Sequence, residues 1–206
     1  FGRIPANPKG VPEVVTMEPV QPAEQRMAAE VEMTPSVAAS YKAVPAVHGD
    51  AAALQVLGVV LGGAPMMGRP GMGGPARPPS GRLHRALVLD QKVATRASAF
   101  FRGQKYGGLF SVSATPAPGR KPDEVEPPLY AELEKLVKEG ITEEELSRAK
   151  NALRVAHYTR LESNAGIREA LAQAESAGTY RDLLDSPKKV EAVTREDVQR
   201  VAKRYL

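Results

Sequence analysis

The sequence predicts an α+β fold, in which an antiparallel sheet carries helices packed on one face. Three observations lead to this prediction. Segments with a period of two, typical of strands, come in pairs, and the last third of the chain has helical periodicity with clear capping residues. Strands and helices also do not alternate regularly, as they would around a parallel sheet. With 206 residues, 42% of them hydrophobic, the chain is long enough for one sizeable core or two small ones.

Two pairs of strands are predicted. In the first pair, apolar residues alternate on both sides of a Thr34-Pro35 turn, at Met27, Ala29, Val31 and Met33 before it and at Val37, Ala39, Tyr41 and Ala43 after it. This pattern predicts a hairpin. In the second pair, the segments VATRASAFFR and GGLFSVSAT are joined through GQKYG, with Phe101 and Phe110 as apolar anchors.

Two helices are predicted between these strand pairs. The segment AAALQVLGVVLGG has the length and apolar content of a helix, with Asp50 as its N-cap and Gly62-Gly63 as its stop. A second, short helix is expected from Arg82 to Asp90.

The last third of the chain is predicted to be helical. A stripe of apolar residues predicts a helix that begins at Pro127-Pro128 and ends at Gly140; it consists of Leu129, Leu133, Leu136 and Val137. Two capping boxes with hydrophobic staples follow, at Thr142 and Glu145 with Ile141 and Leu146, and at Thr194 and Asp197 with Val193 and Val198. Residues expected to face the core are Ala149, Leu153, Ala156 and Leu161, and, in a helix from about 164 to 175, Ile167, Ala170, Leu171 and Ala174.

No self-sufficient active site is visible in the sequence. The absence of Cys excludes disulfides, cysteine metal sites and a thiol nucleophile. The three histidines, His48, His84 and His157, lack the spacing of a zinc-binding helix, so structural or surface roles are expected for them. The acidic run 143–145 is interpreted as a helix cap and not as an acid–base cluster.

Composition also disfavours two classes of partner. The net charge of +4 is mild and aromatic residues make up only 5%, which argues against a nucleic-acid surface. The most apolar run, Ala51–Gly63, is far shorter than the roughly 20 residues of a membrane-spanning helix. We expect a soluble protein of the bacterial periplasm or the cytoplasm, although the sequence does not fix the compartment.

The order of segments resembles the C-terminal half of the insulinase-like zinc metallopeptidases, the family of pitrilysin and the mitochondrial processing peptidase. Four runs carry the resemblance: DAAALQVLGVVLGG, SGRLHRALVLDQKVATRASAFF, YGGLFSVSA and ELEKLVKEGITEEELSRAKNAL. Its most specific parts are Leu-Gly-Gly followed by Ser-x-Arg-Leu, and Gly-Ile-Thr-Glu-Glu-Glu-Leu followed by Lys150 and Asn151.

The resemblance implies one half of a clamshell. In this family two homologous α+β halves, in one chain or two subunits, enclose a chamber, and the N-terminal half carries the zinc motif HxxEH with a distal Glu. This chain has no such motif, so zinc is expected in the partner half. Residues 1–25 are interpreted as an interdomain connector and residues 26–206 as the C-terminal peptidase domain, ending before a final strand of the family.

The resemblance also implies where catalytic assistance would lie. The second half of such enzymes can contribute an Arg and, seven residues later, a Tyr that polarise the substrate carbonyl. Those positions hold Val88 and Thr95 here, and neither can replace the expected donor, so no catalytic residue is predicted. An alternative is that Arg85 or Arg96 has taken over the role.

An insertion rich in Gly, Pro and Met occupies residues 64–79, between Leu-Gly-Gly and Ser-x-Arg-Leu. The non-catalytic subunit of the mitochondrial processing peptidase is similar in having a glycine-rich loop there, linked to substrate capture. One interpretation is therefore a flap over the substrate, with glycine mobility and adaptable Met contacts. The other is an inert surface insertion. The candidate substrate-binding residues are Gly62, Gly63, Met66, Met67, Arg69, Met72 and Arg82.

The expected function follows from the resemblance. This chain would be the zinc-free half of a metalloendopeptidase, forming one wall of the peptide-binding chamber beside an HxxEH-bearing half. The alternative is a non-catalytic assembly subunit of the same fold, like the core proteins of respiratory complexes. A third interpretation is a degraded peptidase half without function.

Overall fold

The computed structural model describes residues 19, 21–64 and 81–206, which belong to two units, Phe1–Met33 and Thr34–Leu206. In the first unit the described residues form neither helix nor strand, and Arg26 pairs with Glu24 at 2.7 Å. The first strand of the hairpin predicted around Thr34-Pro35 is therefore wrong, and Met27 is 96% exposed. A period of two gives a strand only where a neighbouring strand supplies hydrogen bonds, and the second half of the predicted hairpin pairs elsewhere.

The second unit contains one three-stranded antiparallel sheet in the order β1-β3-β2. The strands are β1 (Val37–Ala43), β2 (Ala94–Gly103) and β3 (Gly108–Pro116). The second predicted hairpin is confirmed as β2 and β3, where Phe101 lies opposite Phe110. Tyr41 of β1 lies opposite Phe110 on the other side, so the central strand carries the aromatic centre of the sheet.

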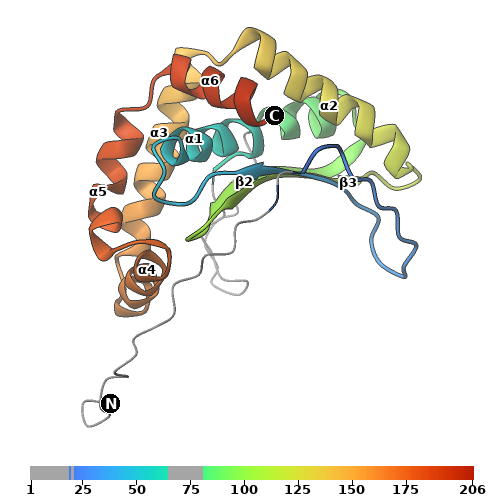
Figure 1. Ribbon diagram of the computed structural model, residues 1–206. Helices are drawn as coiled ribbons and strands as arrows, with labels where there is room; N and C mark the ends of the chain where they lie inside the picture. Colours follow the sequence, from blue (N-terminus) through green and yellow to red (C-terminus); the bar gives the residue numbers. More distant parts are fainter. Residues whose placement is uncertain (1–18, 20, 65–80) are drawn as a thin grey trace. The chain divides into compact units, whose positions relative to one another are not determined.

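Within the described residues, the helices that contact this sheet lie on one side of it (Figure 1), which confirms the predicted fold class. Those that contact the sheet are α1 (Ala51–Gly62), the π-helical turn η1 (His84–Asp90), α2 (Pro122–Glu139) and α6 (Arg195–Tyr205). Those packed beyond them are α3 (Glu143–Arg160), α4 (Asn164–Ala177) and α5 (Tyr180–Glu191). No helix in the described part of the chain is long and apolar enough to cross a bilayer.

The capping boxes predicted for α3 and α6 are confirmed. Thr142 Oγ1 accepts a hydrogen bond from Glu145 N at 3.2 Å, and Thr194 Oγ1 accepts one from Asp197 N at 3.1 Å. Helix α4 also lies where predicted, but only Ala170 of its expected core face is buried, while Ile167 and Leu171 are each 39% exposed. This helix packs mainly on α5 and not on the sheet.

Two features of the helical third differ from the prediction. Helix α2 begins at Pro122 and not at Pro127-Pro128, because Glu124 caps its first turn through Lys121 N at 3.0 Å and Val125 is fully buried. These contacts offset the free-energy cost of the backbone hydrogen bonds that the two interior prolines cannot donate. Helix α5 was not predicted, since Pro187 interrupts its pattern.

Helix α1 lies at the centre of the core. Leu54, Leu57 and Leu61 have no exposed surface, and the helix contacts the sheet on one side and α3, α5 and α6 on others. It approaches β2 through its glycines: a Cβ added to Gly62 would lie 2.3 Å from both the N and the O of Ala99. Only a residue without a side chain fits between this helix and strand.

The N-terminal end of α1 is fixed by Asp50, whose carboxylate is buried. Its side chain does not cap the helix as predicted; instead Oδ1 accepts from Arg200 Nη1 at 2.7 Å and Oδ2 from Tyr205 Oη at 2.8 Å. Burial alone would raise the pKa of Asp50, but the hydrogen bonds from Arg200 and Tyr205 outweigh it and hold the pKa below its usual value. The start of α1 is thereby joined to α6.

Replacing Gly62 with Ala tests the close approach of α1 to β2. We expect Gly62→Ala to lower the free energy of unfolding by about 1–3 kcal/mol, because the new methyl group would overlap backbone atoms that cannot move aside independently. The control is Gly107→Ala, where an added Cβ meets nothing within 4 Å. Urea unfolding followed by circular dichroism measures both, and equal stabilities of the two variants would contradict the close packing.

Candidate substrate-binding site

The two ends of the segment 65–80 meet at the C-terminal end of α1. Gly63 ends the helix with a φ of 91°, a left-handed conformation that favours glycine. A Cβ on Gly81 would lie 2.4 Å from Gly63 N and 2.3 Å from Leu61 O. The glycines of Leu-Gly-Gly and Ser-Gly-Arg-Leu thus have a packing role. Four of the predicted substrate-binding residues, Met66, Met67, Arg69 and Met72, lie outside the described residues.

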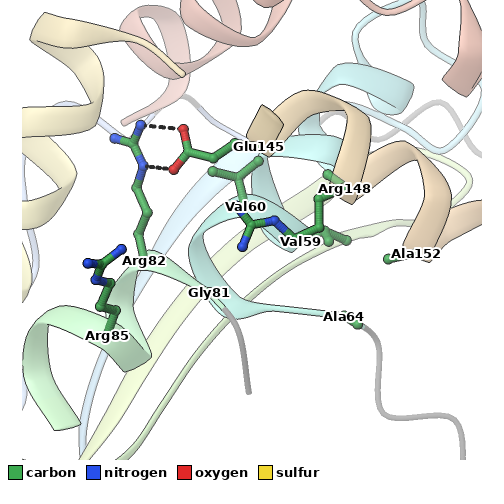
Figure 2. A pocket seen from close by; sticks show the side chains of 10 residues that line it. Val59, Val60, Ala64, Gly81, Arg82, Arg85, Glu145, Arg148 and Ala152 are labelled. Carbon is green, nitrogen blue, oxygen red and sulfur yellow. Dashed lines mark hydrogen bonds and ion pairs between the residues drawn. The ribbon is translucent and has the colours of Figure 1, made fainter. Parts of the chain in front are cut away.

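A small pocket of about 90 Å³ opens beside this junction (Figure 2). Its walls come from α1, from the start of the helical segment at 81–85 and from α3, and are formed by Val59, Val60, Ala64, Gly81, Arg82, Arg85, Glu145, Arg148, Ala149 and Ala152. Small-molecule sites are several times larger, roughly 300 Å³ or more. The pocket therefore has room for a few water molecules or one small polar group.

Arg82, one of the residues predicted to bind substrate, is bonded to Glu145 (Figure 2). Its Nε and Nη2 donate to the two carboxylate oxygens at 2.6 and 2.7 Å, and Nη2 also donates to Gly140 O at 3.0 Å. Burial alone would raise the pKa of Glu145, but the hydrogen bonds from Arg82 outweigh it and lower the pKa. The hydrogen bond with Glu145 raises the pKa of Arg82 in turn. This bidentate pair joins the segment that follows Gly81 to the first turn of α3.

Val88 and Thr95, the two positions at which the resemblance predicts the loss of an assisting Arg and Tyr, offer no comparable donors. Val88 is half-buried on η1 and packs against the core. Thr95 is exposed at an irregularity in the pairing of β2 with β3, and its hydroxyl donates to Thr115 O at 3.4 Å. Arg85 is exposed on η1, and Arg96 is exposed on β2, so a substitute role for either stays a prediction.

The face of the sheet opposite the helices forms a second candidate surface. Val112 is buried on the helix side of the sheet, opposite Ala39 and Ala99. The residues before and after it in β3, and their partners in β1 and β2, point to the other face. Cross-strand hydroxyl pairs lie on this other face, Ser40 with Ser111 at 3.0 Å and Ser98 with Ser113 at 2.9 Å. Phe100 and Leu109 of the same face are 51% and 44% exposed. We call this surface, formed by alternate residues of β1, β3 and β2, the open sheet face.

The histidines do not assemble into a metal site. His48 Nδ1 accepts a hydrogen bond from Asp50 N at 3.0 Å, and the ring of His157 contacts that of Tyr158 edge-on, with centroids 5.4 Å apart. Burial, with Arg160 nearby, lowers the pKa of His157. Within residues 21–64 and 81–206, no group of three His, Asp or Glu side chains is arranged to hold a metal ion.

A larger cavity of about 310 Å³ lies between α3 and α5, and three of the basic side chains that line it are engaged in bonds. Lys150 donates to Glu191 O at 2.7 Å, Arg154 pairs with the Glu191 carboxylate, and Arg160 donates to Gln173 Oε1 at 2.7 Å. These bonds join α3 to its neighbouring helices, so the cavity is best explained as a packing junction.

The sequence pattern of the peptidase M16 inactive domain matches residues 1–153. The chain belongs to this family. The resemblance to the insulinase-like metallopeptidases is thereby confirmed, and the chain is an inactive M16 peptidase domain. No curated protein matches it in sequence.

Solved structures similar to this M16 domain support the same assignment. A protease from Helicobacter pylori is 26% identical with a TM-score of 0.70, over 82% of this chain and 38% of that one. The inactive peptidase domain of a protein proposed to be a zinc protease from Bordetella parapertussis is 29% identical with a TM-score of 0.70, over 86% of this chain and 87% of that one. Complex III from Candida albicans, at 14% identity and a TM-score of 0.66 over 85% of this chain and 41% of that one, shares the fold alone.

The pair of Arg82 and Glu145 can be tested by removing one partner. We expect Arg82→Ala to lower the free energy of unfolding by about 1–3 kcal/mol, because it leaves the Glu145 carboxylate, only 19% exposed, without its bidentate partner. The matched control Arg85→Ala removes an exposed arginine three residues along the same segment and should stay within about 0.5 kcal/mol of the parent. Urea unfolding would contradict a structural role for Arg82 if both variants were equally stable.

Proposed function

We propose that this M16 domain is the non-catalytic half of a zinc endopeptidase and that its open sheet face forms one wall of the peptide chamber. The observation that carries the proposal is that the helices in contact with the sheet, α1, η1, α2 and α6, all lie on its other side, so none of these helices covers the open sheet face. Membership of an inactive peptidase family supports it as well.

Hydrolysis would belong to the homologous half that carries HxxEH, in the same chain or in a separate subunit. There a zinc ion would activate water, with the Glu of the motif as base. The described residues of this domain offer no set of zinc ligands. Val88 has no hydrogen-bond donor in its side chain, and the Thr95 hydroxyl is bonded to Thr115 O and is shorter than a Tyr phenol. Its contribution would be to bind and enclose the peptide.

The segment at 64–79 is proposed to take part in substrate capture as a flap. Its two ends are held together by Gly63, Gly81 and the pair of Arg82 with Glu145, so movement of the segment need not disturb the core. Gly62, Gly63, Met66, Met67, Arg69, Met72 and Arg82 remain the proposed substrate-binding residues; Gly62 and Arg82 also have the packing and ion-pair roles described above.

A second candidate is a non-catalytic assembly subunit. The fold shared with a component of complex III from Candida albicans favours this candidate, but identity of 14% supports the fold and not the role. The two proposals differ in whether an HxxEH-bearing partner accompanies the domain.

Binding and cleavage of an unstructured peptide test the proposed function. We expect the isolated chain to bind the peptide by fluorescence anisotropy, to leave it intact, and to carry no stoichiometric zinc by elemental analysis, because the zinc ligands belong to the other half. Cleavage should appear only when the HxxEH-bearing half is present. Cleavage by this chain alone, or one tightly bound zinc per chain, would overturn the proposal.

Deletion of residues 66–78 tests the flap. Because Gly63 and Gly81 lie in contact, a short link can join the ends, and we expect unchanged unfolding by urea together with weaker peptide binding. A variant in which these residues are replaced by a Gly/Ser segment of equal length separates side-chain contacts from length. Peptide affinity that is unchanged in both variants would contradict the flap and support the interpretation of residues 64–79 as an inert insertion.

A further inference from the structure

The open sheet face belongs to a part of the chain that has cations and no acidic residues. From Gln91 to Pro122 there is no Asp or Glu, whereas the basic residues there are Lys92, Arg96, Arg102, Lys105, Arg120 and Lys121. Strand β1 likewise has Lys42 and no acidic residue. The acidic residues of the unit 34–206 therefore lie outside all three strands and outside the turn that joins β2 and β3.

The register of the strands places these cations in rows with apolar side chains. Leu109 of β3 lies between Lys42 of β1 and Arg102 of β2, which makes a row of cation, leucine and cation across the sheet. In the next row of the same face, Ser111 lies between Ser40 and Phe100. Neighbouring strands are about 4.8 Å apart, so the backbones of Lys42 and Arg102 are about 10 Å apart across Leu109.

The remaining polar groups of this face add no negative charge. The hydroxyls of Ser40 and Ser111 bond to each other, as do those of Ser98 and Ser113, which leaves a neutral surface around the exposed rings and cations. An acidic side chain of an extended peptide would meet the exposed Arg102 here, while its neighbours could contact Phe100 or Leu109. A basic side chain would meet only like charge or neutral groups of the face.

We infer that the open sheet face selects extended peptides that carry acidic side chains beside apolar ones and disfavours basic peptides. Arg102 and Leu109 are its central specificity determinants. The inference rests on the proposed function, because it names the class of peptide that the proposed chamber wall would bind.

The experiment compares three labelled peptides of equal length, with the same apolar residues at alternate positions and Glu, Gln or Lys at the others. Fluorescence anisotropy with the full chain should show that the Glu peptide binds about three- to tenfold more tightly than the Lys peptide at low ionic strength, and that salt reduces the difference. Arg102→Glu should weaken binding of the Glu peptide and strengthen that of the Lys peptide.

The control is Arg168→Glu, which makes the same change of charge at an exposed position on α4, among the helices. It should leave the ratio of the two affinities nearly unchanged, and circular dichroism should show that both variants are folded. Equal affinities for the three peptides, or equal effects of Arg102→Glu and Arg168→Glu, would overturn this inference. They would not contradict the proposal that the open sheet face forms a wall of the peptide chamber. Failure of all three peptides to bind would overturn the proposed function as well.

Discussion

The close contact between helix α1 and strand β2 is the constraint on which the rest of the domain depends. Gly58 and Gly62, one helical turn apart, let the helix lie against the backbone of β2, where a side chain at Gly62 would overlap Ala99. The helix is then surrounded by the sheet and by α3, α5 and α6, so these helices are positioned through it. Its two ends are fixed by charged groups, at Asp50 through α6 and near Gly63 through the pair that holds the returning chain to α3. The contacts of this one apolar helix therefore determine where the helices beyond it lie relative to the sheet.

This arrangement separates the parts of the domain that maintain the fold from the part offered to a ligand. Buried apolar contacts lie among the helices or between them and one face of the sheet, and the ion pairs of Arg82 with Glu145 and of Arg200 with Asp50 also lie on this side. The other face contains short hydroxyls, cations and two large exposed apolar side chains, Phe100 and Leu109, which contribute little to the core. Val88, on η1, belongs to the first group, because its half-buried side chain packs against the margin of the core.

Local signals in the sequence predicted much of this fold, whereas long-range pairings were not predictable. The capping boxes of α3 and α6, the stop at Gly140 and the β2–β3 hairpin depend on residues close together in the chain, and all were found. The strand predicted before Thr34 is absent because alternation of apolar residues does not specify a partner strand. Helix α5 was not predicted because Pro187 interrupts its pattern, although the capping box of Thr179 and Asp182 marks its start. The bond of Arg82 to Glu145 joins residues far apart in sequence, so the capping role of Glu145 could be inferred but its second role could not.

The meeting of Gly63 and Gly81 has a consequence for how this domain can diverge. When the ends of a segment are held together by the folded core, each doubling of the length between them changes the free energy of closure by only about 0.6 kcal/mol. Insertions and deletions between these two glycines are therefore nearly neutral for stability, while substitutions of the glycines themselves are not. Such a junction lets selection vary the length and composition of one segment without compensating changes in the core, and the domain can acquire new binding properties there at little thermodynamic cost.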